Sequence, residues 1–237
     1  MIARLVSIMC LVFGAVGCFG TDTGNPPVAA SLLVRSSDPM VVVAPASAEV
    51  VIERAWISIG DVRAVLGDAC DHVSASYDTD VVGEVIDGIV LTGLPAGRTC
   101  GVHLVPAVVL EVPVAAPEGL LDRSFFVEGR LADGTPFELS TEHAAGLDVI
   151  ASSGFDLVEG AGVLVVFDVA RWVAGLDLAS IPIGADGVAR VGPGTPDIAA
   201  FGAGFVGSVE LYLDAGGDGA FGPAEVAAGP IAQSHAP

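Results

Sequence analysis

The stretch RSFFVEGRLADGTPFELST, residues 123–141, predicts a β-hairpin. Phe125, Val127 and Leu131 recur on one face with charged residues between them, and this two-residue period indicates a strand with one buried side. The Asp-Gly pair at 133–134 predicts a two-residue turn, because glycine accepts a positive φ and aspartate tolerates one. The hairpin therefore favours a β protein.

Similar valine-rich runs, separated by Gly, Pro and Asp, recur along the chain and predict further strands. These strands are expected at residues 31–36, 49–65, 88–94, 100–106, 123–131, 135–141, 147–152 and 162–169. The run GVLVVF (162–167) has no polar alternation, which is typical of a central strand buried on both faces.

One short helix is expected in DVARWVAGL, residues 168–176. Val169, Trp172 and Val173 repeat at helical spacing, Asp168 is a natural N-cap, and Gly175 offers an exit. The apolar face of this helix should close one end of a β core.

The segment LTGLPAGRTCGVHL (91–104) resembles the repeating strand–turn–strand element of prealbumin-like and immunoglobulin-like sandwiches in bacterial surface lipoproteins. The similarity covers about Ala48–Val169 and is carried by strand and turn pattern. It implies an all-β immunoglobulin/prealbumin-like sandwich with one short helix and a C-terminal EF-hand-like loop. We expect the sandwich at 31–190 and a C-terminal strand plus loop at 191–237.

The N-terminus has the pattern of an export signal: a positive start, an apolar run over 5–16 and small residues before Cys18. The sequence AVGC (15–18) resembles the lipobox of bacterial lipoproteins, which implies a signal peptide at 1–17 and a diacylglyceryl thioether on Cys18. A plain secretory peptide with a free thiol is the alternative.

Residues 18–30 are expected to form a flexible tether. Within it, TDTGNP (21–26) resembles a T-[DE]-T-G-N-P segment of Gram-negative lipoproteins. Phe19 follows the lipid cysteine in place of the aspartate that favours inner-membrane retention, so the resemblance implies an outer-membrane lipoprotein that faces the periplasm or the cell surface.

Two cysteines, Cys70 and Cys100, remain after Cys10 leaves with the signal and Cys18 is lipidated. Two thiols in an oxidising compartment usually form a disulfide. A metal or redox pair is the alternative, but the chain has no C-x-x-C spacing.

The chain carries 29 acidic residues against nine basic ones, all of them arginine, and its formal net charge is −20. Such a surface repels nucleic acid and anionic lipid and attracts cations. Hydrophobic residues make up 52% of the chain, which excludes a disordered acidic tail.

The segment DAGGDGAFGPAE (214–225) has partial EF-hand loop spacing. Asp214, Asp218 and Glu225 would supply carboxylates and Ala220 its carbonyl to a Ca²⁺ ion, with an affinity of about 10⁻⁴ to 10⁻³ M. Gly216 replaces one usual ligand, and the strand-like pattern before the loop differs from an EF-hand helix. An acidic, glycine-rich turn without an ion is the alternative.

No other motif indicates chemistry. GAGFVG (202–207) matches a dinucleotide fingerprint, but the chain breaks the required helix early and ends too soon for a βαβ unit. There is no G-x-S-x-G and no H-E-x-x-H, and the four histidines are scattered. Trp56 and Trp172 are expected in the core rather than as sugar-stacking platforms.

The expected function is therefore a non-enzymatic envelope lipoprotein that binds an unidentified envelope or extracellular ligand, adheres or supports structure. The alternatives are a carbohydrate- or peptide-binding accessory module and a hydrolase with dispersed catalytic residues. No nucleic acid or nucleotide partner is expected.

Overall fold

A computed structural model describes residues 30–37, 42–43, 49–67, 69–74, 80–94, 97–158, 160–196 and 198–234. The expected signal peptide, Cys18 and nearly all of the tether lie outside these residues. Among the described residues, no helix has the length and apolar character needed to cross a membrane.

The first sheet has five strands, and its central strand is the one that the sequence predicted. Their order is β14 (Ala232–Gln233), β13 (Val209–Leu213), β11 (Gly162–Phe167), β1 (Ala30–Ser36) and β6 (Ile89–Leu94). β1 runs parallel to β11, and the other pairs are antiparallel. All six residues of β11 are buried, which confirms the predicted two-sided burial.

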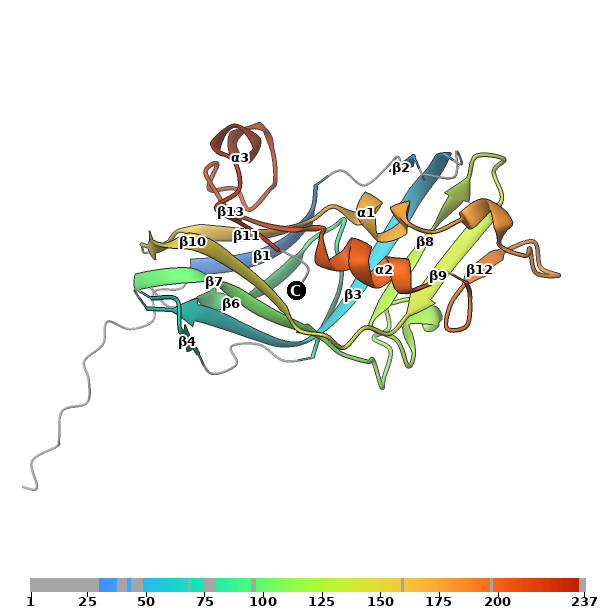
Figure 1. Ribbon diagram of the computed structural model, residues 1–237, viewed down its shortest axis with the longest axis horizontal. Coiled ribbons are helices and arrows are strands. Elements are labelled where there is room, and N and C mark those ends of the chain that lie inside the picture. Colours follow the sequence, from blue (N-terminus) through green and yellow to red (C-terminus); the bar gives the residue numbers. More distant parts are fainter. Residues whose placement is uncertain are drawn as a thin grey trace, which may run out of the picture.

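The second sheet is built along one long strand, β3 (Glu49–Leu66), which crosses the middle of the molecule (Figure 1). The sheet order is β10 (Leu147–Leu157), β7 (Gly97–Pro106), β3, β8 (Phe125–Leu131), β9 (Pro136–Thr141) and β12 (Ala189–Val191). Three shorter strands also pair with β3: β2 (Val42–Val43), β4 (His72–Val73) and β5 (Val81–Glu84). β12 is parallel to β9.

The predicted hairpin is present as β8 and β9, but its turn is longer than the sequence predicted. Gly134 N–H donates to the Leu131 carbonyl (2.8 Å), and Leu131 N–H donates to the Thr135 carbonyl (2.9 Å). Gly134 has a φ of 85°, whereas Asp133 does not have a positive φ. The two-residue turn was therefore wrong: three residues, 132–134, make the connection, with glycine alone in the left-handed region.

A single core of side chains from both sheets fills the space between them. Two helices contribute to this core near the middle of the molecule, between β11 and β8–β9 (Figure 1). The first, α1 (Val169–Ala174), buries Val169, Trp172 and Val173 as predicted. Asp168 makes no capping hydrogen bond. Its carboxylate instead accepts from Arg171 Nε at 3.0 Å. Asp168 thus occupies the predicted N-cap position, but its side chain does not cap the helix.

A second helix, α2 (Ile198–Val206), was not predicted. Its Phe201 and Phe205 join Phe125, Phe167 and Trp172 in a cluster of mostly edge-to-face rings with centroids 4.7–6.0 Å apart. The Trp172 indole N–H donates to Ser208 Oγ (2.9 Å), which satisfies a donor that would otherwise be buried alone.

A third helix, α3 (Pro223–Ala228), follows the acidic loop, residues 214–222. Two 3₁₀ turns, η1 (Glu118–Leu120) and η2 (Leu178–Ser180), complete the elements. The structure is thus mostly β, with two sheets around one core. The expectation of a single short helix was wrong. The immunoglobulin- or prealbumin-like identity of the sandwich stays a prediction.

The predicted disulfide joins Cys70, which precedes β4, to Cys100 on β7, with 5.5 Å between the Cα atoms. It ties the turn after β3 to the neighbouring strand of the same sheet.

Candidate functional site: the β7–β8 surface

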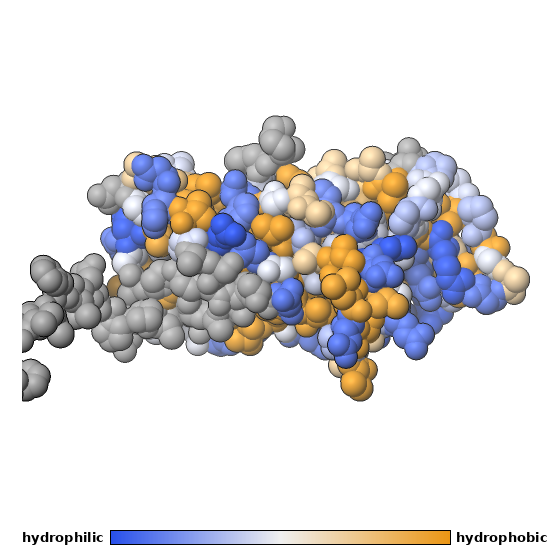
Figure 2. All heavy atoms as spheres, turned by 90° about the horizontal axis from the view of Figure 1, so that it is seen from below, coloured by the Kyte–Doolittle hydropathy of each residue, from blue (hydrophilic) through white to orange (hydrophobic). Residues whose placement is uncertain are grey.

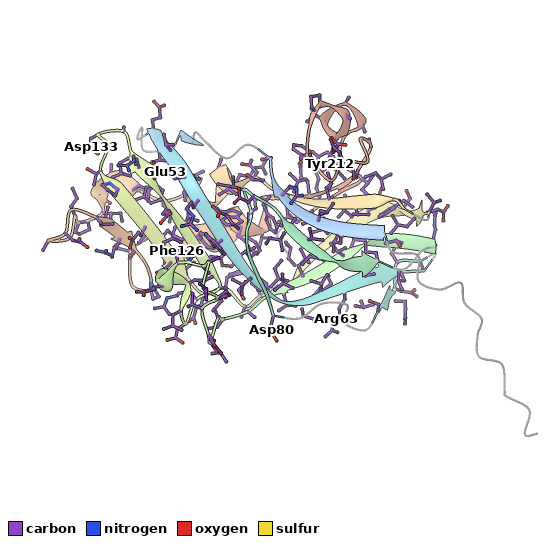
Figure 3. All side chains as sticks on the ribbon, turned by 180° about the vertical axis from the view of Figure 1, so that it is seen from behind. Glu53, Arg63, Asp80, Phe126, Asp133 and Tyr212 are labelled. Atoms are coloured by element: carbon purple, nitrogen blue, oxygen red, sulfur yellow. A yellow bond between two sulfur atoms is a disulfide. The ribbon has the colours of Figure 1, made fainter. Side chains whose placement is uncertain are left out.

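The connection between β7 and β8, residues 107–124, packs against side chains of the second sheet that the main core does not include. Trp56 and Phe126 form a separate buried cluster with Val109 and Leu120 of the connection. Figure 3 labels Phe126, which is 3% exposed beneath this cover. Arg54 lies over the Trp56 ring, 5.2 Å from its centroid. Both tryptophans, at positions 56 and 172, are buried, as predicted.

Hydrogen bonds hold this connection in one conformation. Val109 N–H donates to the Arg123 carbonyl and Asp122 N–H to the Val109 carbonyl, both at 2.9 Å, while Ala107 N–H donates to the Ser58 carbonyl of β3 at 3.0 Å. Pro113 and Pro117 further restrict the backbone. The connection is therefore an ordered part of the fold, fixed at both of its ends.

Three apolar side chains of this ordered connection face the solvent. Leu110 is 83% exposed, Val114 is fully exposed and Leu121 is 48% exposed. Hydrophobic residues gather on the face that contains the connection (Figure 2). We call Leu110, Val114 and Leu121 the β7–β8 surface. Apolar side chains that form a contiguous exposed patch are typical of interaction sites.

A hollow of about 310 Å³ adjoins the β7–β8 surface, and its lining combines apolar side chains with carboxylates. Leu110 and Val82 contribute apolar walls, and Asp80 and Glu111 contribute acids. The lining residues are Ser58, Asp80, Val82, Val108, Val109, Leu110, Glu111 and Pro113. No arginine or histidine is among the described residues that line it, so the hollow suits an apolar group that carries or neighbours a positive charge.

The acidic loop at 214–222 contains three of the four predicted calcium ligands, and its carboxylates accept hydrogen bonds from the backbone. Asp214 accepts from Gly217 N–H (2.7 Å) and Gly219 N–H (2.9 Å), and Asp218 accepts from Ala220 N–H (2.9 Å). These bonds close the loop by protein groups alone.

Glu225 is the most buried of the predicted ligands, at 2% exposed. Its two carboxylate oxygens accept from Gly216 N–H and Gly222 N–H, both at 2.9 Å. These backbone donors, led by Gly216, lower the pKa of Glu225. Across the described residues, no group of three or more His, Cys, Asp or Glu side chains is arranged to hold a metal ion. Calcium binding stays a prediction.

The acidic loop also covers the outer face of the first sheet. Phe221 packs against Tyr212 of β13, with ring centroids 4.9 Å apart, and Arg35 Nε of β1 donates to the Gly219 carbonyl at 2.8 Å. Leu164 and Val166 of β11 lie in the same buried cluster. This cover explains why β11 is apolar at every position.

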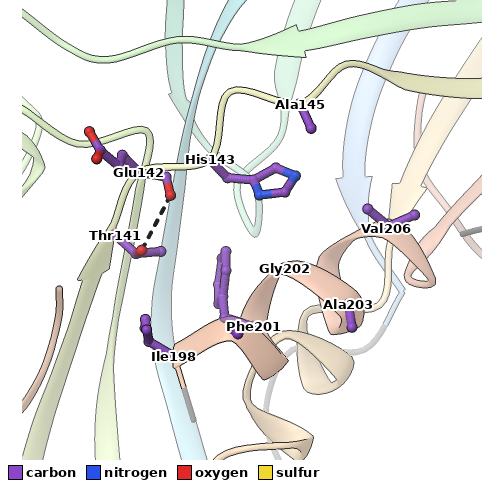
Figure 4. A pocket seen from close by; sticks show the side chains of 10 residues that line it. Thr141, Glu142, His143, Ala145, Ile198, Phe201, Gly202, Ala203 and Val206 are labelled. Atoms are coloured by element: carbon purple, nitrogen blue, oxygen red, sulfur yellow. Dashed lines mark hydrogen bonds between the residues drawn. The ribbon is translucent and has the colours of Figure 1, made fainter. Parts of the chain in front are cut away.

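A hollow of about 500 Å³ lies between α2 and the connection from β9 to β10 (Figure 4). Its walls include Ile198, Ala203 and Val206, and its polar members include Glu142 and His143. Burial lowers the pKa of His143, so its imidazole is neutral at pH 7. No nucleophile among the described residues is hydrogen-bonded to this imidazole.

His103 and Asp148 form the one histidine–carboxylate pair that the described part of the chain contains, with 2.7 Å between Nδ1 and Oδ1. A hydrolytic site of the triad type also needs a hydroxyl or thiol on the other ring nitrogen. No such group is bonded to His103 in the described segments. The hydrolase alternative therefore gains no support from this pair.

No known protein family, curated protein or solved structure matches this chain.

The β7–β8 surface was not predicted from the sequence. The segment AVVLEVPVAAPEGLLD (107–122) is apolar but has two internal prolines and no strand or helix period. The available signal for this surface was an apolar run that cannot be placed in a helix or a strand. Nothing in it indicated which residues would be covered and which exposed.

Proposed function

We propose that the protein is a non-enzymatic, lipid-anchored envelope protein that binds a macromolecular partner through the β7–β8 surface. The anchor is the lipid expected on Cys18 at the outer membrane, and the sandwich holds the binding surface. The observation that carries the proposal is the exposure of Leu110 and Val114 on an ordered connection.

Order matters because binding a flexible loop costs conformational entropy. Immobilising a side chain or loop at an interface costs about 0.5–1.5 kcal/mol for each rotamer-rich side chain. The β7–β8 connection is already fixed by backbone hydrogen bonds and by the burial of Val109 and Leu120. Its apolar groups can therefore be covered by a partner at low entropic cost.

The alternatives have less support. An exposed tryptophan platform would favour carbohydrate binding, but Trp56 and Trp172 are both buried. A hydrolase of the triad type needs a nucleophile beside a base, and neither His103 nor His143 has one within the described residues. A peptide-binding accessory role is compatible with the β7–β8 surface and is a narrower form of the same proposal.

Site-specific photo-crosslinking in intact cells tests the proposal. A photoreactive amino acid replaces Leu110 in the full chain, and the matched control carries it at Val226 of α3, which is 62% exposed. We expect a discrete protein adduct at position 110 and none at 226. Absence of an adduct at 110, or equal adducts at both positions, contradicts the binding role.

Mass spectrometry of the membrane-extracted protein tests the anchor separately. We expect a mature chain that begins at Cys18 and carries a diacylglyceryl adduct. An intact leader or an unmodified thiol contradicts the lipid anchor. The binding role is then judged from the crosslinking result only.

A further inference from the structure

We infer that the partner of the β7–β8 surface is a protein segment that presents an apolar side chain beside arginine or lysine side chains. This inference rests on the proposed function and names the chemistry of the same site. It follows from the charges around the three exposed apolar residues.

Four carboxylates accompany the apolar side chains. Asp80 and Glu111 line the adjoining hollow, and Glu118 and Asp122 belong to the connection itself. All four residues are exposed. None of them is in an ion pair within the described residues. Figure 3 labels Asp80 at the lower edge of the ribbon, below Phe126.

The arginines of the described residues do not neutralise these carboxylates. Six of the eight are paired with other acids: Arg54, Arg63, Arg98, Arg130, Arg171 and Arg190. The other two donate to backbone carbonyls, Arg35 to Gly219 and Arg123 to Asp122. Arg123 brings one positive charge to the connection itself. The four carboxylates therefore leave a net negative charge beside the apolar groups, and a partner with positive charge complements it.

The same carboxylates disfavour two other occupants. In a two-fold contact with a second copy, the four carboxylates of one copy would face the four carboxylates of the other and repel them. An anionic lipid surface would repel them for the same reason. Arginine is the preferred complement because its planar guanidinium binds carboxylates through two hydrogen bonds and its weak hydration suits an interface.

The test uses the mature, lipidated protein in phosphatidylcholine nanodiscs, with empty nanodiscs as the blank. The probes are two dye-labelled synthetic peptides, one in which leucine alternates with arginine and one in which glutamate replaces each arginine. Fluorescence anisotropy gives the two affinities. We expect the arginine peptide to bind at least about tenfold more tightly than the glutamate peptide.

Two variants locate the binding. Leu110→Ser/Val114→Ser should weaken the arginine peptide about tenfold, and Glu111→Gln/Glu118→Gln should reduce its advantage over the glutamate peptide. The matched control, Val90→Ser/Val226→Ser, changes two valines that are 71% and 62% exposed elsewhere. It should bind like the unchanged protein.

Equal binding of the two peptides, no binding of the arginine peptide, or equal losses in the surface and control variants would overturn the inference. A protein adduct in cells together with equal peptide affinities would reject the charge preference and keep the binding role. A phospholipid adduct at position 110 in place of a protein adduct would identify the membrane as the occupant. Failure of both the adduct and the peptide binding would reject the inference and the proposed function together.

Discussion

Two glycines in α2, Gly202 and Gly204, have different surroundings, although a single residue separates them in the helix. A Cβ on Gly204 would lie 2.1 Å from the Arg171 carbonyl oxygen of α1, whereas a Cβ on Gly202 would lie 3.4 Å from the nearest His143 ring atoms. Gly204 thus permits the close contact of α1 and α2. Gly202 only lowers the helix propensity of its position.

We predict changes of opposite sign at these glycines. Gly204→Ala should destabilise the protein by about 1–3 kcal/mol, because the new methyl group clashes with backbone. Gly202→Ala should stabilise it by up to about 1 kcal/mol, because alanine is the better helix former and an ordinary contact awaits its Cβ. Urea denaturation of both variants measures the difference. Equal effects would show that the α1–α2 contact is looser than described.

Glu225 gives a pH dependence of known direction. Its folded pKa is lowered by backbone donors, so its contribution to stability is present above its unfolded pKa of about 4.3 and is lost as the pH falls through the folded pKa. Glu225→Gln should therefore melt at a lower temperature than the unchanged protein at pH 7. The gap should narrow as the pH falls below the unfolded pKa and close once the pH lies below the lowered folded pKa. A gap that stayed constant with pH would assign the effect to packing.

At the scale of elements, the β7–β8 connection combines a buried anchor with exposed groups. Leu120 is fully buried against Trp56 and Phe126, and Leu110 is 83% exposed. Leu120→Ala should cost about 2–3 kcal/mol of unfolding free energy, as cavity-forming changes do. Leu110→Ser should change it by less than about 0.5 kcal/mol. Thermal unfolding checks both values, and a large loss in Leu110→Ser would disqualify that variant as a binding probe.

The disulfide constrains the chain between β3 and β7. The sequence separation of 30 residues between Cys70 and Cys100 corresponds to about 3–4 kcal/mol of stabilisation through the unfolded state. We predict a loss of that size in Cys70→Ser/Cys100→Ser, with the sheet register retained. Denaturation in the absence of reductant measures it, beside the unchanged protein treated with reductant as the matched comparison.

The elements that the sequence predicted are those whose pattern is local. The alternation of Phe125, Val127 and Leu131 is enough to define a strand, and the uninterrupted β11 run is enough to indicate a central one. Cysteine parity was enough for the disulfide. These features need no knowledge of which distant segment lies opposite.

The elements that were missed depend on tertiary contacts. Gly202 and Gly204 have a low helix propensity, which disfavours a helix at this position. However, α2 is stabilised by Phe201 and Phe205 in the aromatic cluster and by its close packing on α1. The exposed and buried residues of the β7–β8 connection likewise differ only by what lies beneath them. The pattern of a single sequence shows neither the packing of α2 on α1 nor the residues that lie beneath the β7–β8 connection.

At the scale of the whole molecule, a formal net charge of −20 makes self-repulsion a property of the entire fold. The described ion pairs are mostly at the surface, where each contributes little, and they leave most carboxylates unpaired. Salt shortens the range of this repulsion, from a Debye length of about 30 Å at 0.01 M to about 8 Å at 0.15 M. We therefore predict that NaCl raises the melting temperature over this range.

Calcium separates general screening from a specific site. If Asp214, Asp218, Ala220 and Glu225 bind Ca²⁺ with a Kd of about 10⁻³ M, then roughly 10 mM free Ca²⁺ adds about 1.4 kcal/mol beyond the effect of NaCl at equal ionic strength. That increment should vanish in Asp214→Ala/Glu225→Ala, whose melting temperature without calcium is already lower because four backbone N–H groups lose their acceptors. The calcium increment, and not the starting temperature, is therefore the quantity to compare. Identical melting curves in calcium and matched NaCl would mean that backbone hydrogen bonds alone close the acidic loop.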